Sequence, residues 1–133
     1  AQLKHDLSVP SGQLVDFLDQ ANNDCREILD GVRINAFGHL GDGNVHFNLS
    51  PPAGWKDFSG LDNEFAVKLG RLATMMGGSF AAEHGLGRSK TALADILRDP
   101  VERGLMMRIK KALDDAEQLN PSVLITYNNF HDV

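Results

Sequence analysis

The sequence predicts an α+β fold: an antiparallel sheet of ferredoxin-like split βαβ type with helices on one face, followed by C-terminal helices. Three observations favour it. Strand-like and helix-like segments alternate over the first two thirds of the chain. A glycine-rich turn at 41–44 joins two of the strand-like segments as a hairpin. The last third shows helical periodicity.

The chain is expected to open with a strand and a helix. Apolar and polar residues alternate over His5–Pro10, and Pro10 ends this strand. Ser11 is the expected N-cap of the helix, because its hydroxyl can accept a backbone N–H of the first turn. The helix carries a single apolar stripe: Leu14, Leu18, Ala21, Cys25 and Ile28. This stripe predicts that Cys25 is a buried core thiol and not a nucleophile.

The middle of the chain predicts a hairpin, a second helix and a short strand. The hairpin strands are Val32–Phe37 and Val45–Leu49. The helix stripe is Phe65, Leu69, Leu72 and Met76, and Gly77-Gly78 forms its C-cap. The strand Ser79–His84 ends at Gly85-Leu-Gly87.

A further helix is predicted to begin at Asp99. This residue is the N-cap, Pro100 lies in the first turn and Glu102 takes the third position. Leu105, Ile109 and Ala112 continue its apolar stripe until Asn120-Pro121 stops the helix.

Composition excludes several classes of protein. Apolar residues make up 42% of the chain and charged residues 23%, which is typical of a soluble globular domain. No apolar run approaches the roughly 20 residues that a membrane span needs. A net charge of -5 with scattered basic residues argues against nucleic-acid binding. A single cysteine allows a reducing compartment, and we expect a cytoplasmic protein. Because the chain begins without Met, we expect a piece of a longer protein.

The hairpin carries two histidines that are expected to face each other. If Asp42-Gly43 is the centre of the turn, Leu40 lies opposite Val45 and His39 lies opposite His46. Leu40 and Val45 would then point to the core, while Phe37 and Asn48 would share the face of the histidines. Two imidazoles so placed can bind one metal ion at about 2.0–2.1 Å. The alternative is two surface or core histidines near a tight turn.

A second polar cluster, over 81–90, supplies a possible third ligand. Glu83 would complete a His₂Glu set with an open position, an arrangement familiar in catalytic zinc sites. In a regular strand Glu83 and His84 point to opposite faces, so both serve one site only if the strand ends there. The alternative is a solvent-facing Glu83 paired with Arg88 or Lys90.

The motifs resemble those of a known family. Three segments are similar to motifs in the C-terminal part of the FAD-linked oxidases: Gly38–His46, Ala82–Gly87 with Lys90, and Leu119-Asn-Pro121. This family includes D-2-hydroxyglutarate, D-lactate and glycolate dehydrogenases. The resemblance covers nearly the whole chain in the right order. Phe37 and Asn48 make the D-2-hydroxyglutarate branch the most similar. The family's usual Leu-Asn-Pro-Gly-Lys is replaced here by a motif that continues with Ser122-Val123.

The resemblance implies roles for individual residues. His39, His46 and Glu83 would bind a divalent metal, Zn²⁺ being expected. His84 would be the catalytic residue between substrate and flavin and would accept the proton of the substrate hydroxyl. Asn48 would bind the substrate, and Asn120 would approach the flavin.

The resemblance also implies what the whole protein does. Residues 1–133 would form the C-terminal domain of an enzyme that oxidises a D-2-hydroxy acid to the 2-oxo acid. FAD would be bound mainly by an N-terminal domain of the same polypeptide, and a homo-oligomer is possible. Two other functions stay open: a non-catalytic ferredoxin-like metal-binding or sensing module, and a metal-dependent hydrolase.

Overall fold

The computed structural model describes residues 1–125, and the chain divides into two compact units, Ala1–His84 and Gly85–Val133. Residues 126–133, which belong to the predicted domain 1–133, lie outside the described residues. Among the residues that are described, no helix combines the length and the apolar character needed to cross a bilayer.

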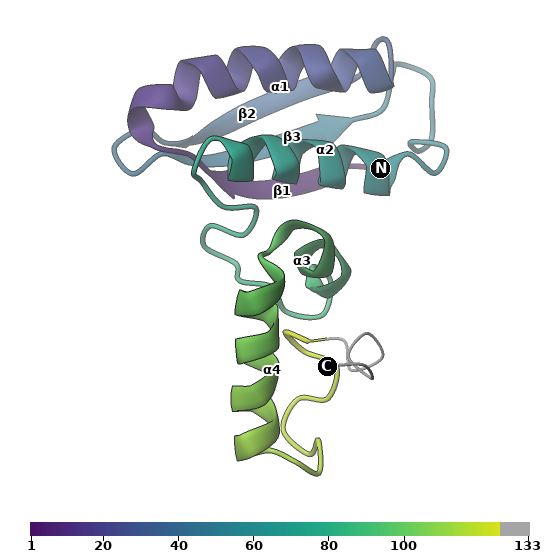
Figure 1. The fold of residues 1–133 in the computed structure, drawn as a ribbon. Helices are drawn as coiled ribbons and strands as arrows, with labels where there is room; N and C mark the ends of the chain where they lie inside the picture. Colours follow the sequence, from purple (N-terminus) through teal and green to yellow (C-terminus); the bar gives the residue numbers. More distant parts are fainter. Residues whose placement is uncertain (126–133) are drawn as a thin grey trace. The chain divides into compact units, whose positions relative to one another are not determined.

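The first unit is the predicted α+β arrangement. Its elements are β1 (Leu3–Ser8), a 3₁₀ turn η1 (Ser11–Gln13), α1 (Leu14–Ile28), β2 (Arg33–His39), β3 (Asn44–Ser50) and α2 (Asp62–Met75). The strands form an antiparallel sheet in the order β1-β3-β2. Both α1 and α2 lie against one side of this sheet (Figure 1). The predicted fold class is therefore confirmed.

The core of this unit lies between the two helices and the sheet. Side chains alternate along each strand, so every second residue of β1 and β3 faces the helices. Phe17 of α1 meets Phe47 of β3 edge-to-face, with ring centroids 6.3 Å apart. The most deeply buried residues of the layer include Leu7, Phe17, Cys25, Phe47, Leu49, Phe65 and Leu69.

The start of α1 differs from the prediction. Ser11 opens the 3₁₀ turn and is not the N-cap of α1. The residue at the N-cap of α1 is Gln13, which makes no side-chain capping hydrogen bond. Phe17 is fully buried whereas Leu18 is only half-buried, so the buried stripe passes through Phe17. The larger ring takes the position opposite Phe47.

The end of α2 is the predicted glycine C-cap. The N–H of Gly77 donates to Thr74 at 3.0 Å and the N–H of Gly78 donates to Ala73 at 2.9 Å, the hydrogen bonds of a Schellman motif. Gly77 has a φ of 78°, which favours glycine. A Cβ on Gly78 would lie 1.8 Å from the carbonyl oxygen of Ser8. Glycine is therefore required at Gly78 by the close approach to β1.

The predicted strand Ser79–His84 is wrong in extent, because only one bridge forms, between Ser79 and Ser8. Its two backbone hydrogen bonds measure 2.8 and 2.9 Å. They lie on the edge of β1 opposite β3, where a ferredoxin-like sheet has its fourth strand. After Ala82 the backbone N–H groups of Glu83 and His84 turn to the side chain of Asp6, which stops the ladder.

The second unit contains α3 (Thr91–Leu97) and α4 (Pro100–Leu113). Asp99 is the predicted N-cap of α4 and accepts hydrogen bonds from the N–H groups of Val101 (2.8 Å) and Glu102 (3.2 Å). Buried Arg103 pairs with Asp95 and donates to the carbonyl of Leu124 at 2.6 Å.

The predicted end of α4 is wrong. The helix stops at Leu113, well before Asn120-Pro121, because the carboxylate of Asp114 accepts hydrogen bonds from the N–H groups of Gln118 (2.8 Å) and Leu119 (2.9 Å). The predicted apolar stripe is also not buried within this unit. All three of its residues, Leu105, Ile109 and Ala112, are exposed, and so are Val101 and Leu113 of the same helix.

Candidate functional site

The polar residues of the sheet gather on the face opposite α1 and α2. Because neighbouring strands are antiparallel and in register, residues of this face form three cross-strand rows. The rows are Ser8–Asn44–His39, Asp6–His46–Phe37 and Lys4–Asn48–Asn35. Three of the predicted site residues, His39, His46 and Asn48, therefore share one face.

The hairpin register differs from the prediction by two residues. His39 pairs with Asn44, and His46 pairs with Phe37. The turn is Leu40–Gly43, so Leu40 is exposed and the prediction that it enters the core is wrong, whereas Val45 is buried as predicted. A shift of two residues leaves each side chain on its original face. The two imidazoles are consequently diagonal neighbours, with ring centroids 6.3 Å apart.

The observed register is fixed by a contact from outside the hairpin. The N–H of Val9 donates to the carbonyl of Gly43 at 3.0 Å. Gly43 has a φ of 71°, and a Cβ there would lie 1.9 Å from the carbonyl oxygen of Val9. The side chain of Asp42 accepts the N–H of Asn44 at 3.1 Å.

Glu83 and His84 both reach the polar face because the strand does end before them. Glu83 Oε1 lies 3.4 Å from Nδ1 of His39 and accepts a hydrogen bond from the side-chain amide of Asn44. The ring of His84 stacks on that of His46, with centroids 6.0 Å apart and planes inclined by 29°. The predicted condition for one shared site is thus met.

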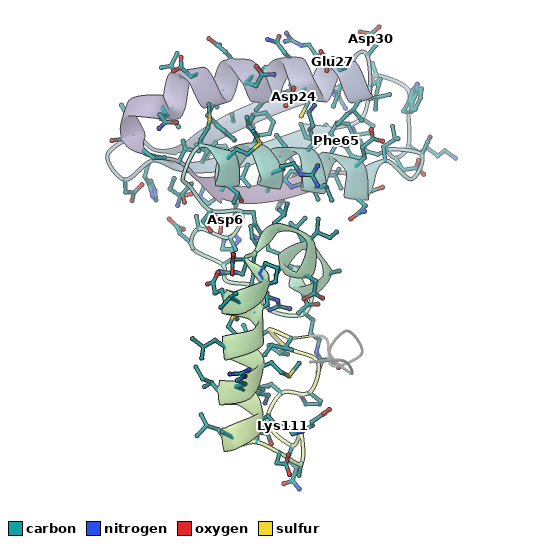
Figure 2. The ribbon with its side chains drawn as sticks, in the orientation of Figure 1. Asp6, Asp24, Glu27, Asp30, Phe65 and Lys111 are labelled. Atoms are coloured by element: carbon teal, nitrogen blue, oxygen red, sulfur yellow. The ribbon has the colours of Figure 1, made fainter. Side chains whose placement is uncertain are left out.

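Asp6 is a central residue of the site that the sequence analysis missed. Its side chain is 3% exposed, and Oδ2 accepts the N–H of Glu83 at 2.8 Å and that of His84 at 2.9 Å. Nδ1 of His46 and Nδ1 of His84 each lie 3.7 Å from its carboxylate. Figure 2 labels Asp6 below the sheet and Asp24 at α1. An aspartate in mid-strand was the available signal.

A pocket of about 230 Å³ lies beside these rings. The tilted ring of Phe37 contacts His46, with centroids 5.2 Å apart. The pocket thus combines imidazole rings, an amide and an ammonium group. The ammonium group is that of Lys4, which was not predicted to be a site residue. Its lining residues are Lys4, His5, Asp6, Phe37, His46, Asn48 and His84.

The predicted metal ligands are only partly brought together. Histidine and glutamate are chemically suited to zinc, and His39 and Glu83 lie at a separation that two ligands of one ion can have. His46, however, directs Nδ1 toward Asp6. Within residues 1–125, no three His, Cys, Asp or Glu side chains form a group that could hold a metal ion. The ligand set His39, His46 and Glu83 therefore stays a prediction.

Asn120, the predicted flavin-side residue, belongs to the second unit. It is exposed and has a φ of 50°, in the left-handed region that asparagine tolerates. Its predicted role stays a prediction.

Comparison with known proteins gives consistent matches. Residues 1–124 match the family described as FAD linked oxidases, C-terminal domain. An uncharacterized FAD-linked oxidoreductase of Mycobacterium tuberculosis is 38% identical over 119 residues, which are 90% of this chain and 24% of that protein. The mitochondrial D-2-hydroxyglutarate dehydrogenase of Arabidopsis thaliana is 34% identical over 131 residues, 98% of this chain and 22% of that protein. The D-lactate dehydrogenase of Archaeoglobus fulgidus is 32% identical over 121 residues, 90% of this chain and 26% of that protein. The chain thus spans about a quarter of the length of these relatives.

Proposed function

Because this chain belongs to the family of FAD linked oxidases, C-terminal domain, we propose that it forms the substrate side of an FAD-dependent oxidoreductase that oxidises a D-2-hydroxy acid to the 2-oxo acid. The names of relatives, D-2-hydroxyglutarate and D-lactate dehydrogenases, support this substrate class. The observation that carries the proposal is the pocket in which His84, His46, Asn48 and Lys4 meet.

The pocket offers the groups that a 2-hydroxy acid requires. Lys4 supplies a positive charge for a substrate carboxylate, and the amide of Asn48 can donate to or accept from a neutral oxygen. The two residues are direct cross-strand partners, so both project from one place on the sheet. Asn48 is accordingly the proposed substrate-binding residue.

His84 is the proposed proton acceptor. Its side chain is 66% exposed and lines the pocket, so a substrate can reach it. A neutral imidazole can accept the proton of the hydroxyl group as the C2 hydride leaves. FAD, bound mainly by an N-terminal domain of the same polypeptide, would supply the hydride acceptor.

His39, His46 and Glu83 are the proposed ligands of a divalent metal, with zinc as the expected ion. The His39–Glu83 pair is at ligand-sharing distance, and the ring of His46 is a neighbour of His39, with ring centroids 6.3 Å apart. A metal at this point would polarise the substrate hydroxyl and carboxylate.

The experiment that tests the proposal is a substrate screen of the purified full-length protein. We expect a flavin absorbance spectrum and dye reduction with one or more of D-2-hydroxyglutarate, D-lactate, D-malate and glycolate. The L enantiomers of the chiral acids are the matched controls and should react much more slowly. Bound flavin with no turnover of any D-2-hydroxy acid would contradict the substrate class. A protein without flavin but with metal would instead favour a non-catalytic metal-binding module.

A further inference from the structure

We infer that Asp6 is a positioning residue that holds His46 and His84 with Nδ1 toward its carboxylate, so that both rings present Nε2 to the pocket. The effect of this arrangement on turnover rests on the proposed function, whereas the arrangement itself does not.

The geometry places one carboxylate between two imidazoles. Asp6 is the direct cross-strand partner of His46, and Oδ1 lies 3.7 Å from Nδ1 of that ring. Oδ2 lies 3.7 Å from Nδ1 of His84. Both separations are longer than a hydrogen bond, so the carboxylate orients each ring electrostatically. A small rotation of a ring would shorten its separation to that of a hydrogen bond.

The carboxylate is itself held in place. It is 3% exposed, and Oδ2 accepts two backbone hydrogen bonds, from Glu83 and His84. Hydrogen bonds from two N–H groups favour the ionised carboxylate, which acts only as an acceptor. Asp6 therefore fixes the backbone that carries His84 and offers a fixed negative charge to both rings.

A fixed acceptor selects the tautomer of a neutral imidazole. The ring nitrogen that faces a carboxylate is favoured as the N–H, and the other nitrogen then keeps its lone pair. In both histidines this leaves Nε2 able to accept a proton or to bind a metal ion. His46 and His84 would thus be set for their different proposed roles by one carboxylate.

A purely structural Asp6 side chain would hold only the backbone of Glu83 and His84, and the variant Asp6→Asn separates the two roles. The amide oxygen of asparagine can still accept the N–H groups of Glu83 and His84. Its NH₂ group then occupies the place of Oδ1 and faces Nδ1 of His46 as a donor. The backbone is retained, while the negative charge is lost and the preferred tautomer of His46 is reversed.

The test measures the tautomers directly, by two-bond ¹⁵N–¹H correlation spectra of the metal-free full-length protein labelled with ¹⁵N-histidine. At about pH 8 an unperturbed imidazole is neutral, so the tautomer is visible. We expect Nδ1–H for His46 and His84 in the wild type, and Nε2–H for His46 in Asp6→Asn. Asp24→Asn is the matched control, because Asp24 is a buried carboxylate of the same unit that pairs with Lys68. It should leave both tautomers unchanged.

Either of two results overturns the inference. Nε2–H tautomers in the wild type would do so without reference to any variant, so a poorly folded Asp6→Asn protein leaves the inference testable. A His46 tautomer that is unchanged in a stably folded Asp6→Asn protein would do so as well.

Turnover separates this inference from the proposed function. If the enzyme oxidises a D-2-hydroxy acid, Asp6→Asn should lower kcat roughly 10- to 100-fold, the usual scale for a carboxylate that orients a ligand or base, with a smaller change in KM. Predicted tautomers in a protein that oxidises none of the acids would contradict the proposed function and support the positioning role.

Discussion

Glu83 and His84 are neighbours in sequence whose side chains have different surroundings. Glu83 contacts His39 and Asn44, whereas His84 stacks on His46 beside the pocket. The two substitutions should therefore fail in different ways in the full-length enzyme. Glu83→Gln should lose metal and activity together, because a neutral amide is a poor metal ligand. His84→Gln should retain metal and flavin and lose roughly 10²–10⁴-fold in turnover, the scale of a general base.

Metal content by elemental analysis, together with steady-state kinetics, checks both variants. The opposite outcome, in which His84→Gln loses metal and Glu83→Gln keeps it, would mean that the two residues exchange the proposed roles. The two variants act as controls for each other, since they alter adjacent positions of the same segment.

Cys25 is expected to be chemically inert in the folded protein. Its side chain is fully buried in α1, and this burial, together with the nearby Asp24, raises the pKa of the thiol to about 12. Only the thiolate reacts readily with electrophiles, so alkylation of the native protein should be very slow. Mass spectrometry of the Cys25 peptide should show labelling only after denaturant is added. Rapid labelling of the native protein near neutral pH would contradict the buried position.

At this scale the sequence predicted some residues and could not predict others. The burial of Cys25 and the shared face of His39 and His46 could be predicted because apolar spacing and the alternation of side chains along a strand are local signals. Asp6 could not be assigned its role, because its hydrogen-bond donors lie 77 and 78 residues further along the chain. Glu83 and His84 become partners of Asp6 only in the folded chain, where the segment after α2 lies along the edge of β1.

Among the elements, the end of α2 offers a test of the close approach between the Gly77-Gly78 turn and β1. Gly78→Ala should destabilise the protein by about 1–3 kcal/mol or more, because its Cβ would lie 1.8 Å from the carbonyl of Ser8. Gly12→Ala is the control, since a Cβ there meets nothing within 4 Å. Its effect should stay within about 0.5 kcal/mol. Urea unfolding midpoints measure both, and equal midpoints would argue against the contact.

The turn after α4 depends on an ionised carboxylate. The hydrogen bond from Lys110 and the backbone N–H groups of Leu119 and Gln118 hold the pKa of Asp114 below its ordinary value. A lowered folded-state pKa stabilises the fold above the unfolded-state pKa, and this contribution is lost as the pH falls through the folded-state pKa. Asp114→Asn should therefore lower the thermal stability at pH 7 and flatten its loss in acid. The exposed neighbour Asp115→Asn is the control, and equal melting temperatures for the two variants would contradict the prediction.

Secondary structure was predicted better than its boundaries. The Asp99 cap and the Gly77-Gly78 cap were predictable because each uses a local pattern of a few residues. The hairpin register was not, because the hydrogen bond from Val9 to Gly43 comes from outside the hairpin. The prediction of where α4 ends was wrong for a related reason. The helix is ended by the hydrogen bonds of the Asp114 side chain and not by Pro121.

For the whole molecule, the proposal places most of the FAD-binding residues outside these 133 residues. The sequence contains no glycine-rich strand-to-helix turn of the kind that holds a dinucleotide, and the segment Gly85-Leu-Gly87 is too short to serve as one. A polypeptide of these 133 residues expressed by itself should therefore be colourless and should reduce no dye with any of the four acids. Absorbance spectra and the same dye assay measure this, with the full-length protein as the control. Flavin absorbance in the purified short chain would place cofactor-binding residues within it.

Two contacts of the polar face, the hairpin pairing and the contact of Asp6 with Glu83, join residues that are separated by very different lengths of chain. The hairpin that carries His39 and His46 closes a short turn, a step that takes about 1–10 μs in isolated hairpins. The contact of Asp6 with Glu83 closes a loop of 77 residues, and the entropy cost of closure rises with loop length. The hairpin histidines can therefore meet while the pocket is still open on the side of His84. The pocket is completed only when β1 has formed its contacts with residues 79–84, the last segment of the first unit.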